Sequence, residues 1–92
     1  MAARPAREAV TRWNLAYAEQ TAALFAAANA ESGDPAPIAR LATAYRAVAS
    51  AWRVLAADLG VPLWARHAAA VAAEEFERRA RVEDSRLSGG EG

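Results

Sequence analysis

The sequence predicts an all-α protein that folds as an antiparallel three-helix bundle. Ala supplies 28 of the 92 residues, and Ala is the strongest helix former. Large apolar residues recur at spacings of three and four along three segments, and short stretches with Gly and Pro separate these segments. We expect helices over residues 6–30, 35–59 and 62–83, packed as antiparallel neighbours. Residues 1–83 should form a single domain. Residues 84–92 contain too little apolar material to order themselves, so we expect a mobile, disordered tail.

The first predicted helix, residues 6–30, is amphipathic. Charged residues such as Arg12 and Glu19 occupy one side of its helical wheel, and we expect the apolar side to face the core. That apolar side contains Val10, Trp13, Asn14, Tyr17, Thr21, Leu24, Phe25 and Ala28. Leu15 lies about 140° from the centre of this side, so it should not reach the core.

The second predicted helix, residues 35–59, has the clearest start and stop signals. Asp34 can accept backbone N–H groups as an N-cap, and Pro35 suits the first helical position. A heptad seam follows, consisting of Ile38, Leu41, Tyr45, Val48, Trp52, Leu55 and Leu59. We expect Trp52, at its centre, to be fully buried. Val54 lies about 150° away from the seam and should be outside the core. Gly60 should end the helix in a left-handed conformation.

The third predicted helix, residues 62–83, begins at Pro62. Its apolar half contains Trp64, Ala65, Ala68, Val71, Ala72, Phe76, Ala80 and Val82. Glu75 and Arg79 fall within this half, where they form an interfacial ion pair, contact a partner, or lie on a solvated, frayed helix end. Leu63 falls outside the apolar half.

Because Ala buries little area, the large side chains should supply the core. The expected core consists of Trp13, Tyr17, Leu24, Phe25, Ile38, Leu41, Tyr45, Val48, Trp52, Leu55, Leu59, Trp64, Val71 and Phe76. On the polar side of the third helix, we expect ion pairs at i,i+4 spacing between Glu74 and Arg78 and between Glu77 and Arg81.

The composition bounds the function. The 11 Arg residues balance 11 acidic residues and there is no Lys. This usage is typical of a GC-rich bacterial genome. The chain has no Cys, which excludes disulfides and thiolate chemistry. Its longest small-apolar run, residues 22–28, is far shorter than the roughly 20 residues of a membrane span, and its first ten residues do not resemble a signal peptide. We expect a protein of the cytoplasm with no membrane partner.

The sequence contains no motif typical of catalysis, metal binding or cofactor binding. His67 is the only histidine, and it has no companion at metal-ligand or general-base spacing. Ser and Thr residues have no neighbouring His base, and no Gly-rich phosphate loop or dinucleotide motif occurs. We therefore expect no enzyme activity, no metal and no cofactor. Polar residues on the apolar sides, namely Asn14, Thr21, Tyr17 and Tyr45, leave open a small ligand cavity.

The stretch from Leu55 to Val71 resembles the helix-turn-helix of bacterial DNA-binding regulators. Ala56, Leu59, Gly60 and Val61 match the turn of that family. The resemblance implies DNA contacts from Arg66 and His67. The chain departs from the pattern because Arg66 stands where the family has an apolar residue, and because Ala cannot hydrogen-bond a base edge.

We expect a non-enzymatic helical module of protein–protein interaction or oligomerisation, a small accessory or adaptor subunit. Its partner is itself, as a homodimer, or another protein. The alternative is a small DNA-binding regulator that uses residues 55–71, although DNA is the less favoured partner. A small-ligand-binding bundle is the third hypothesis. The candidate interface consists of Leu15, Val54, Leu63, Trp64, Glu75 and Arg79.

Overall fold

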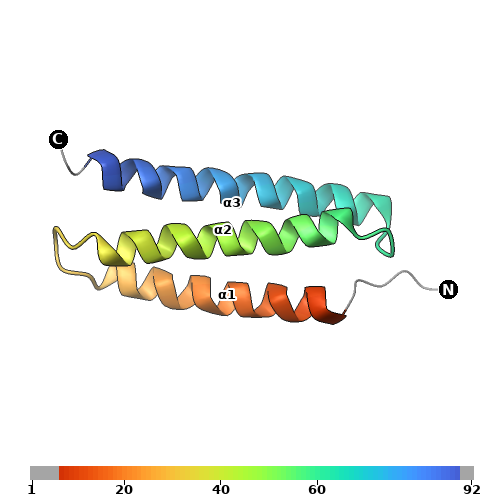
Figure 1. Cartoon of the computed structure of the whole chain (residues 1–92), viewed down its shortest axis with the longest axis horizontal. Coiled ribbons are helices and arrows are strands. Elements are labelled where there is room, and N and C mark those ends of the chain that lie inside the picture. The colour runs from red at the N-terminus through yellow and green to blue at the C-terminus, as the bar shows by residue number, and fades with distance from the viewer. Residues whose placement is uncertain (1–6, 90–92) are drawn as a thin grey trace.

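The protein consists of three antiparallel helices. The computed structural model describes residues 7–89, with α1 at Arg7–Ala28, α2 at Ala36–Ala57 and α3 at Leu63–Gly89. Helix α2 lies between the other two (Figure 1). The predicted bundle is thus confirmed. The third helix continues past Glu83 to Gly89, so residues 84–89 are helical where the sequence predicts a disordered tail. Residues 90–92 of that tail lie outside the described residues.

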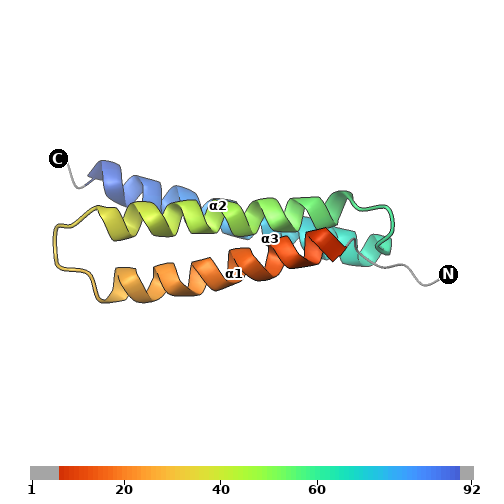
Figure 2. The same cartoon turned by 60° about the horizontal axis from the view of Figure 1, so that its bottom comes forward.

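The bundle is flattened, because α1 and α3 do not approach each other closely. Within the described residues, no Cα atom of α1 lies within 8 Å of a Cα atom of α3. The Cα trace measures 54 × 21 × 14 Å, and in the turned view α3 passes partly behind α2 (Figure 2). The two outer helices meet through large side chains, such as Tyr17 and Phe76, whose ring centroids are 5.7 Å apart.

The turns begin and end α2 largely as predicted. Pro35 already has helical angles (φ −79°, ψ −17°), and the Asp34 carboxylate accepts the Ala36 N–H at 3.0 Å. The prediction for Gly60 is wrong, since Gly33 is the glycine with positive φ among the described residues. The helix instead ends at Asp58, which is extended (φ −79°, ψ 109°). Its carboxylate accepts the Gly60 N–H at 2.8 Å, which closes the turn without a left-handed residue.

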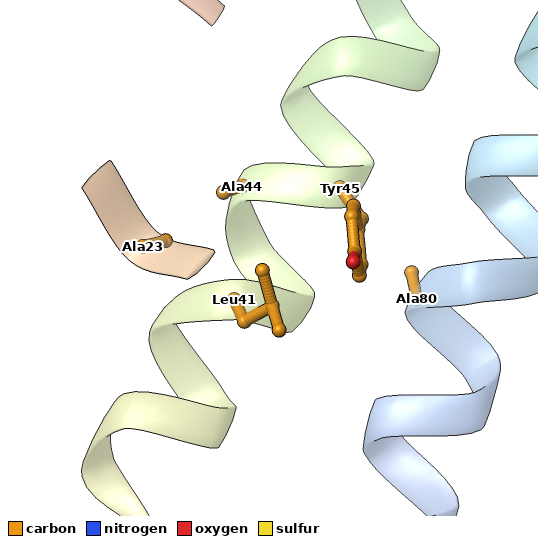
Figure 3. Close-up of a cluster of buried hydrophobic side chains, with 5 residues drawn as sticks. All are labelled: Ala23, Leu41, Ala44, Tyr45 and Ala80. Carbon is orange, nitrogen blue, oxygen red and sulfur yellow. The ribbon is translucent and has the colours of Figure 1, made fainter. Parts of the chain in front are cut away.

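The core is built mainly of alanine, contrary to the prediction from large side chains. Ten of the thirteen buried apolar residues within 7–89 are Ala, and Leu41, Tyr45 and Val48 are the other three. Figure 3 shows Ala23 of α1 beside Ala44 and Leu41 of α2, with Ala80 of α3 beside Tyr45. Because an Ala side chain is a single methyl group, helices that meet through Ala can approach closely, and the larger rings of Trp13, Tyr17 and Phe76 pack against this core only partly buried.

The predicted apolar sides of α1 and α3 are rotated away from α2. On α1, Ala9, Ala16 and Ala23 form the buried line, which is about 120° from the centre of the predicted side. Large side chains of α1 and α3 that are predicted to be core are therefore exposed, namely Leu24, Phe25, Trp64 and Val71. Leu59 is exposed for another reason, because α2 ends at Ala57 and Leu59 lies in the turn that follows. The seam of α2 is predicted correctly in its direction. However, Trp52 is half-buried rather than fully buried, and it packs against Trp13 and Tyr17 of α1 with ring centroids 5.5 and 6.4 Å away.

Candidate functional site

The side of α3 that faces away from α2 carries a continuous line of exposed residues. Its buried line contains Ala69, Ala73 and Ala80, and the exposed line lies roughly 160° around the helix from it. This line, here called the α3 stripe, consists of Trp64, Ala68, Val71, Glu75, Arg78 and Val82, all of them exposed except Glu75, which is half-buried. Three large apolar side chains are therefore directed outward on a helix whose inner side is already packed.

The apolar surface continues onto the turn between α2 and α3. Leu59 is 85% exposed, Leu63 is 72% exposed and Trp64 is 76% exposed. The exposure of Leu63 agrees with the prediction. Single exposed apolar residues are ordinary on a protein surface. Three large ones within six residues of chain, next to the α3 stripe, form a patch of the kind that binds other molecules.

Charged groups interrupt the α3 stripe at its centre. Glu75 forms ion pairs with Arg78 at 2.7 Å and with Arg79 at 3.0 Å. Hydrogen bonds from Arg78, and then from Arg79, lower the pKa of the Glu75 carboxyl from its ordinary 4.5 to about 2. The Arg79 guanidinium also lies 4.8 Å from the centre of the Phe76 ring. The predicted pair of Glu75 and Arg79 thus forms, on the surface of an intact helix rather than on a frayed end.

The two ion pairs predicted on the polar side of α3, Glu74 with Arg78 and Glu77 with Arg81, are wrong. Glu77 pairs with Arg53 of α2 at 2.7 Å instead of with Arg81, and Arg78 pairs with Glu75 instead of with Glu74. Glu77 pairs across the helices because Arg53 on the neighbouring α2 lies within reach of its carboxylate. Within the described residues, Glu74 and Arg81 form no salt bridge, which leaves one acidic and one basic group beside the α3 stripe.

The other two residues of the predicted interface, Leu15 and Val54, lie away from the α3 stripe and in environments that differ from each other. Leu15 is exposed, as predicted, in an open groove of about 760 Å³ whose lining includes Arg12, Glu19 and Ala47. Val54 is half-buried and does not belong to the buried core, so it lies outside the core as predicted but is less exposed than Leu15. Helix α2 has a neighbour on each side, and a residue far from its seam is therefore still partly covered. The structure does not bring Leu15 together with Leu63, Trp64 and the Glu75–Arg79 pair.

The polar residues on which the hypothesis of a small ligand cavity is based do not lie together in one place. Asn14 and Thr21 are exposed on α1. The Tyr17 hydroxyl accepts a hydrogen bond from the Trp52 indole N–H at 2.9 Å. Trp13 packs edge-on against Trp52, with ring centroids 5.5 Å apart. This aromatic cluster fills the space between α1 and α2 and uses the polar groups internally.

The region that resembles a helix-turn-helix has the geometry of a helical hairpin. Helices α2 and α3 lie antiparallel and side by side (Figure 1), whereas the DNA-binding motif crosses its helices at about 90–120°. His67 is exposed, and Arg66 is half-buried with its Nε atom buried and unpaired. The two predicted DNA contacts therefore differ in accessibility.

Within residues 7–89, no three His, Asp or Glu side chains are grouped so that they could hold a metal ion. No helix in the same range combines the length and the apolar character needed to cross a lipid bilayer. No family model, curated protein or solved structure matches the chain. Its function must therefore be argued from its own residues.

Sequence reasoning missed the α3 stripe as a unit. It assigned Val71 and Val82 to the core half of the helix and treated Glu75 separately. One signal was present, because the six residues of the stripe follow each other at spacings of four and three, which is the repeat of a helix-pairing seam. Residues Ala9, Ala16 and Ala23 on α1, seven apart, carried the corresponding signal for the buried side.

Proposed function

We propose that the chain is a non-enzymatic helical module of protein–protein interaction or oligomerisation, a small accessory or adaptor subunit. Its partner is a second copy of the chain or another protein. The observation that carries the proposal is the exposure of Trp64 together with Leu59 and Leu63 at the turn between α2 and α3. Large aromatic side chains are enriched among the residues that dominate binding energy in protein interfaces.

The energetics of the bundle support the same function. Covering a large apolar side chain contributes about 1.5–3 kcal/mol, and this chain leaves several of them outside while its own interior uses Ala. A partner that covers Trp64 and its neighbours would therefore gain free energy that the isolated fold does not use. The composition, rich in Ala and Arg and without Lys, favours a bacterial protein, and we place the module in the cytoplasm.

The proposal is tested by comparing wild type with Trp64→Ser and with Leu15→Ser, a matched change at a similarly exposed residue on α1. Self-association is measured by sedimentation, and binding of other proteins by affinity capture from cells of the source organism followed by binding of the purified candidate. We expect Trp64→Ser to abolish the interaction and Leu15→Ser to leave it intact. An interaction that survives Trp64→Ser, or the absence of any interaction at 0.1–0.2 mM, roughly a hundred times a micromolar Kd, would overturn the proposal.

A further inference from the structure

We propose that the α3 stripe binds the α3 stripe of a second copy in antiparallel orientation, so that the two chains form a dimer with two-fold symmetry. The inference rests on the proposed function, since it names the partner of the same surface. It begins from the spacing of the stripe, which continues past Val82 through Ser85 to Gly89, both exposed. Residues at alternating spacings of four and three face one direction over a whole helix, which is the geometry of paired helices.

One antiparallel alignment matches every position of the stripe by size and charge. It places Val71 opposite Val82 of the second copy, and Glu75 opposite Arg78 of the second copy. Two-fold symmetry repeats each pairing. Farther out, Ala68 meets Ser85, and Trp64 meets Gly89, which has no side chain and leaves room for the indole. Apolar groups thus meet apolar groups, small residues meet small ones, and the two central carboxylates meet guanidinium groups.

The charges beside the stripe fit the same alignment. Glu74 and Arg81 lie on the same flank of α3, and the antiparallel dimer brings Glu74 of one copy near Arg81 of the other. Neither residue has a salt bridge within its own chain among the described residues. In the dimer they would form two further ion pairs between opposite charges, one on each side of the symmetry axis.

Other alignments of the same two surfaces are less favourable. A parallel pairing in register places Glu75 against Glu75 and Arg78 against Arg78, and like charges in contact oppose association. An antiparallel pairing shifted by one heptad places Val71 against Glu75 and Ala68 against Arg78, which leaves charged groups against apolar ones. The charges at the centre of the stripe therefore select the orientation and the register of the dimer.

The contact is a strip about 40 Å long, at 1.5 Å per residue from Trp64 to Gly89, and one helix wide. The area that such a narrow strip buries on each partner is smaller than the roughly 800 Å² per partner of a standard interface. We therefore expect a dimer with a Kd in the micromolar range, and its measurement requires protein at concentrations of about 10–200 µM.

The test uses charge reversals at the two central positions. Glu75→Arg alone places two positive charges opposite each other, and Arg78→Glu alone places two negative ones. Each variant by itself should dimerise at least ten-fold more weakly than wild type in sedimentation equilibrium. An equimolar mixture of the two should form a heterodimer, and the double variant Glu75→Arg/Arg78→Glu should dimerise by itself. Circular dichroism checks that the helical content is unchanged, as expected because neither side chain is fully buried.

The orientation is tested by oxidative cross-linking, which is clean because the chain has no Cys. Val71→Cys mixed with Val82→Cys should give a disulfide-linked heterodimer, whereas Val71→Cys alone should not cross-link. Efficient cross-linking of Val71→Cys alone, or a dimer indifferent to the charge reversals, would overturn the inference. A wild-type chain that is monomeric at 200 µM would overturn it too. In that case the proposed function still stands if Trp64→Ser abolishes binding of another protein.

Discussion

Substituting Ala23 by Leu tests whether α1 packs through its alanines. Ala23 is fully buried (0% exposed) and contacts Leu41 and Ala44 of α2 (Figure 3). A Leu adds three carbon atoms at a place where the helices are separated by methyl groups. Inserting methylene groups into a packed interior costs about 1–3 kcal/mol. For a domain of this size, about 2 kcal/mol lowers the melting temperature by roughly 8–16 °C.

Two variants on the same helix serve as controls in thermal unfolding monitored by circular dichroism. Ala22→Leu makes the same chemical change at an exposed position and should shift the melting temperature by only a degree or two. Leu24→Ala removes a large side chain that is 40% exposed. It should cost less than the 2–5 kcal/mol of a buried Leu. If Ala23→Leu melts with wild type while Leu24→Ala is severely destabilised, α1 buries the side that the hydrophobic periodicity predicts, and the alanine packing is refuted.

Three further outcomes follow from single contacts. Val48→Ala removes two methyl groups from a fully buried residue. It should cost roughly 1–2 kcal/mol in chemical denaturation, since the transfer and cavity terms of two methyl groups exceed the gain of about 0.5 kcal/mol from the better helix propensity of Ala. Tyr17→Phe removes the acceptor of the Trp52 indole N–H. It should cost about 1 kcal/mol, and an unchanged denaturation midpoint would show that water replaces the hydroxyl. Because the pKa of Glu75 is lowered from 4.5 to about 2, its ionised form stabilises the fold above pH 4.5, and this contribution is lost as the pH falls toward 2. Glu75→Gln should weaken that acid dependence, and 1 M NaCl should do the same because the pair is exposed.

The limits of the sequence prediction differ between the inner and the outer helices. Helix α2 has neighbours on both sides and therefore buries a wide arc of its surface. The large residues Leu41, Tyr45 and Val48 lie at the centre of that arc, so the apolar side predicted from them is the buried side. On α1 and α3, the largest side chains set the apparent apolar side, whereas alanines make the contact. A hydrophobicity pattern weights residues by size, and close helix packing favours the smallest ones. The predicted sides of α1 and α3 are therefore about 100–120° out of phase with the buried ones.

The same rotation explains which parts of the candidate site could be predicted. The exposure of Leu15 and Leu63 followed from the helical wheel, since both lie outside either choice of buried side. The spacing of the α3 stripe is present in the sequence, but the outward direction of Val71, Glu75 and Val82 follows only once Ala69 and Ala73 are known to face α2. That assignment depends on the neighbouring helix and not on the local sequence.

The alanine core and the outward stripe are two consequences of one arrangement. When a helix packs through Ala, its large residues must lie on the flanks or on the outer side. On α1 they lie partly on the flank, where Tyr17 contacts Phe76 of α3 and becomes half-buried. On α3 they lie on the outer side, where the described chain offers no cover. In the proposed dimer, the charges distinguish a docking surface from a mere excess of apolar residues. Glu75 and Arg78 occupy two consecutive positions of the heptad line, and only an antiparallel copy, in one register, places each of them against its opposite.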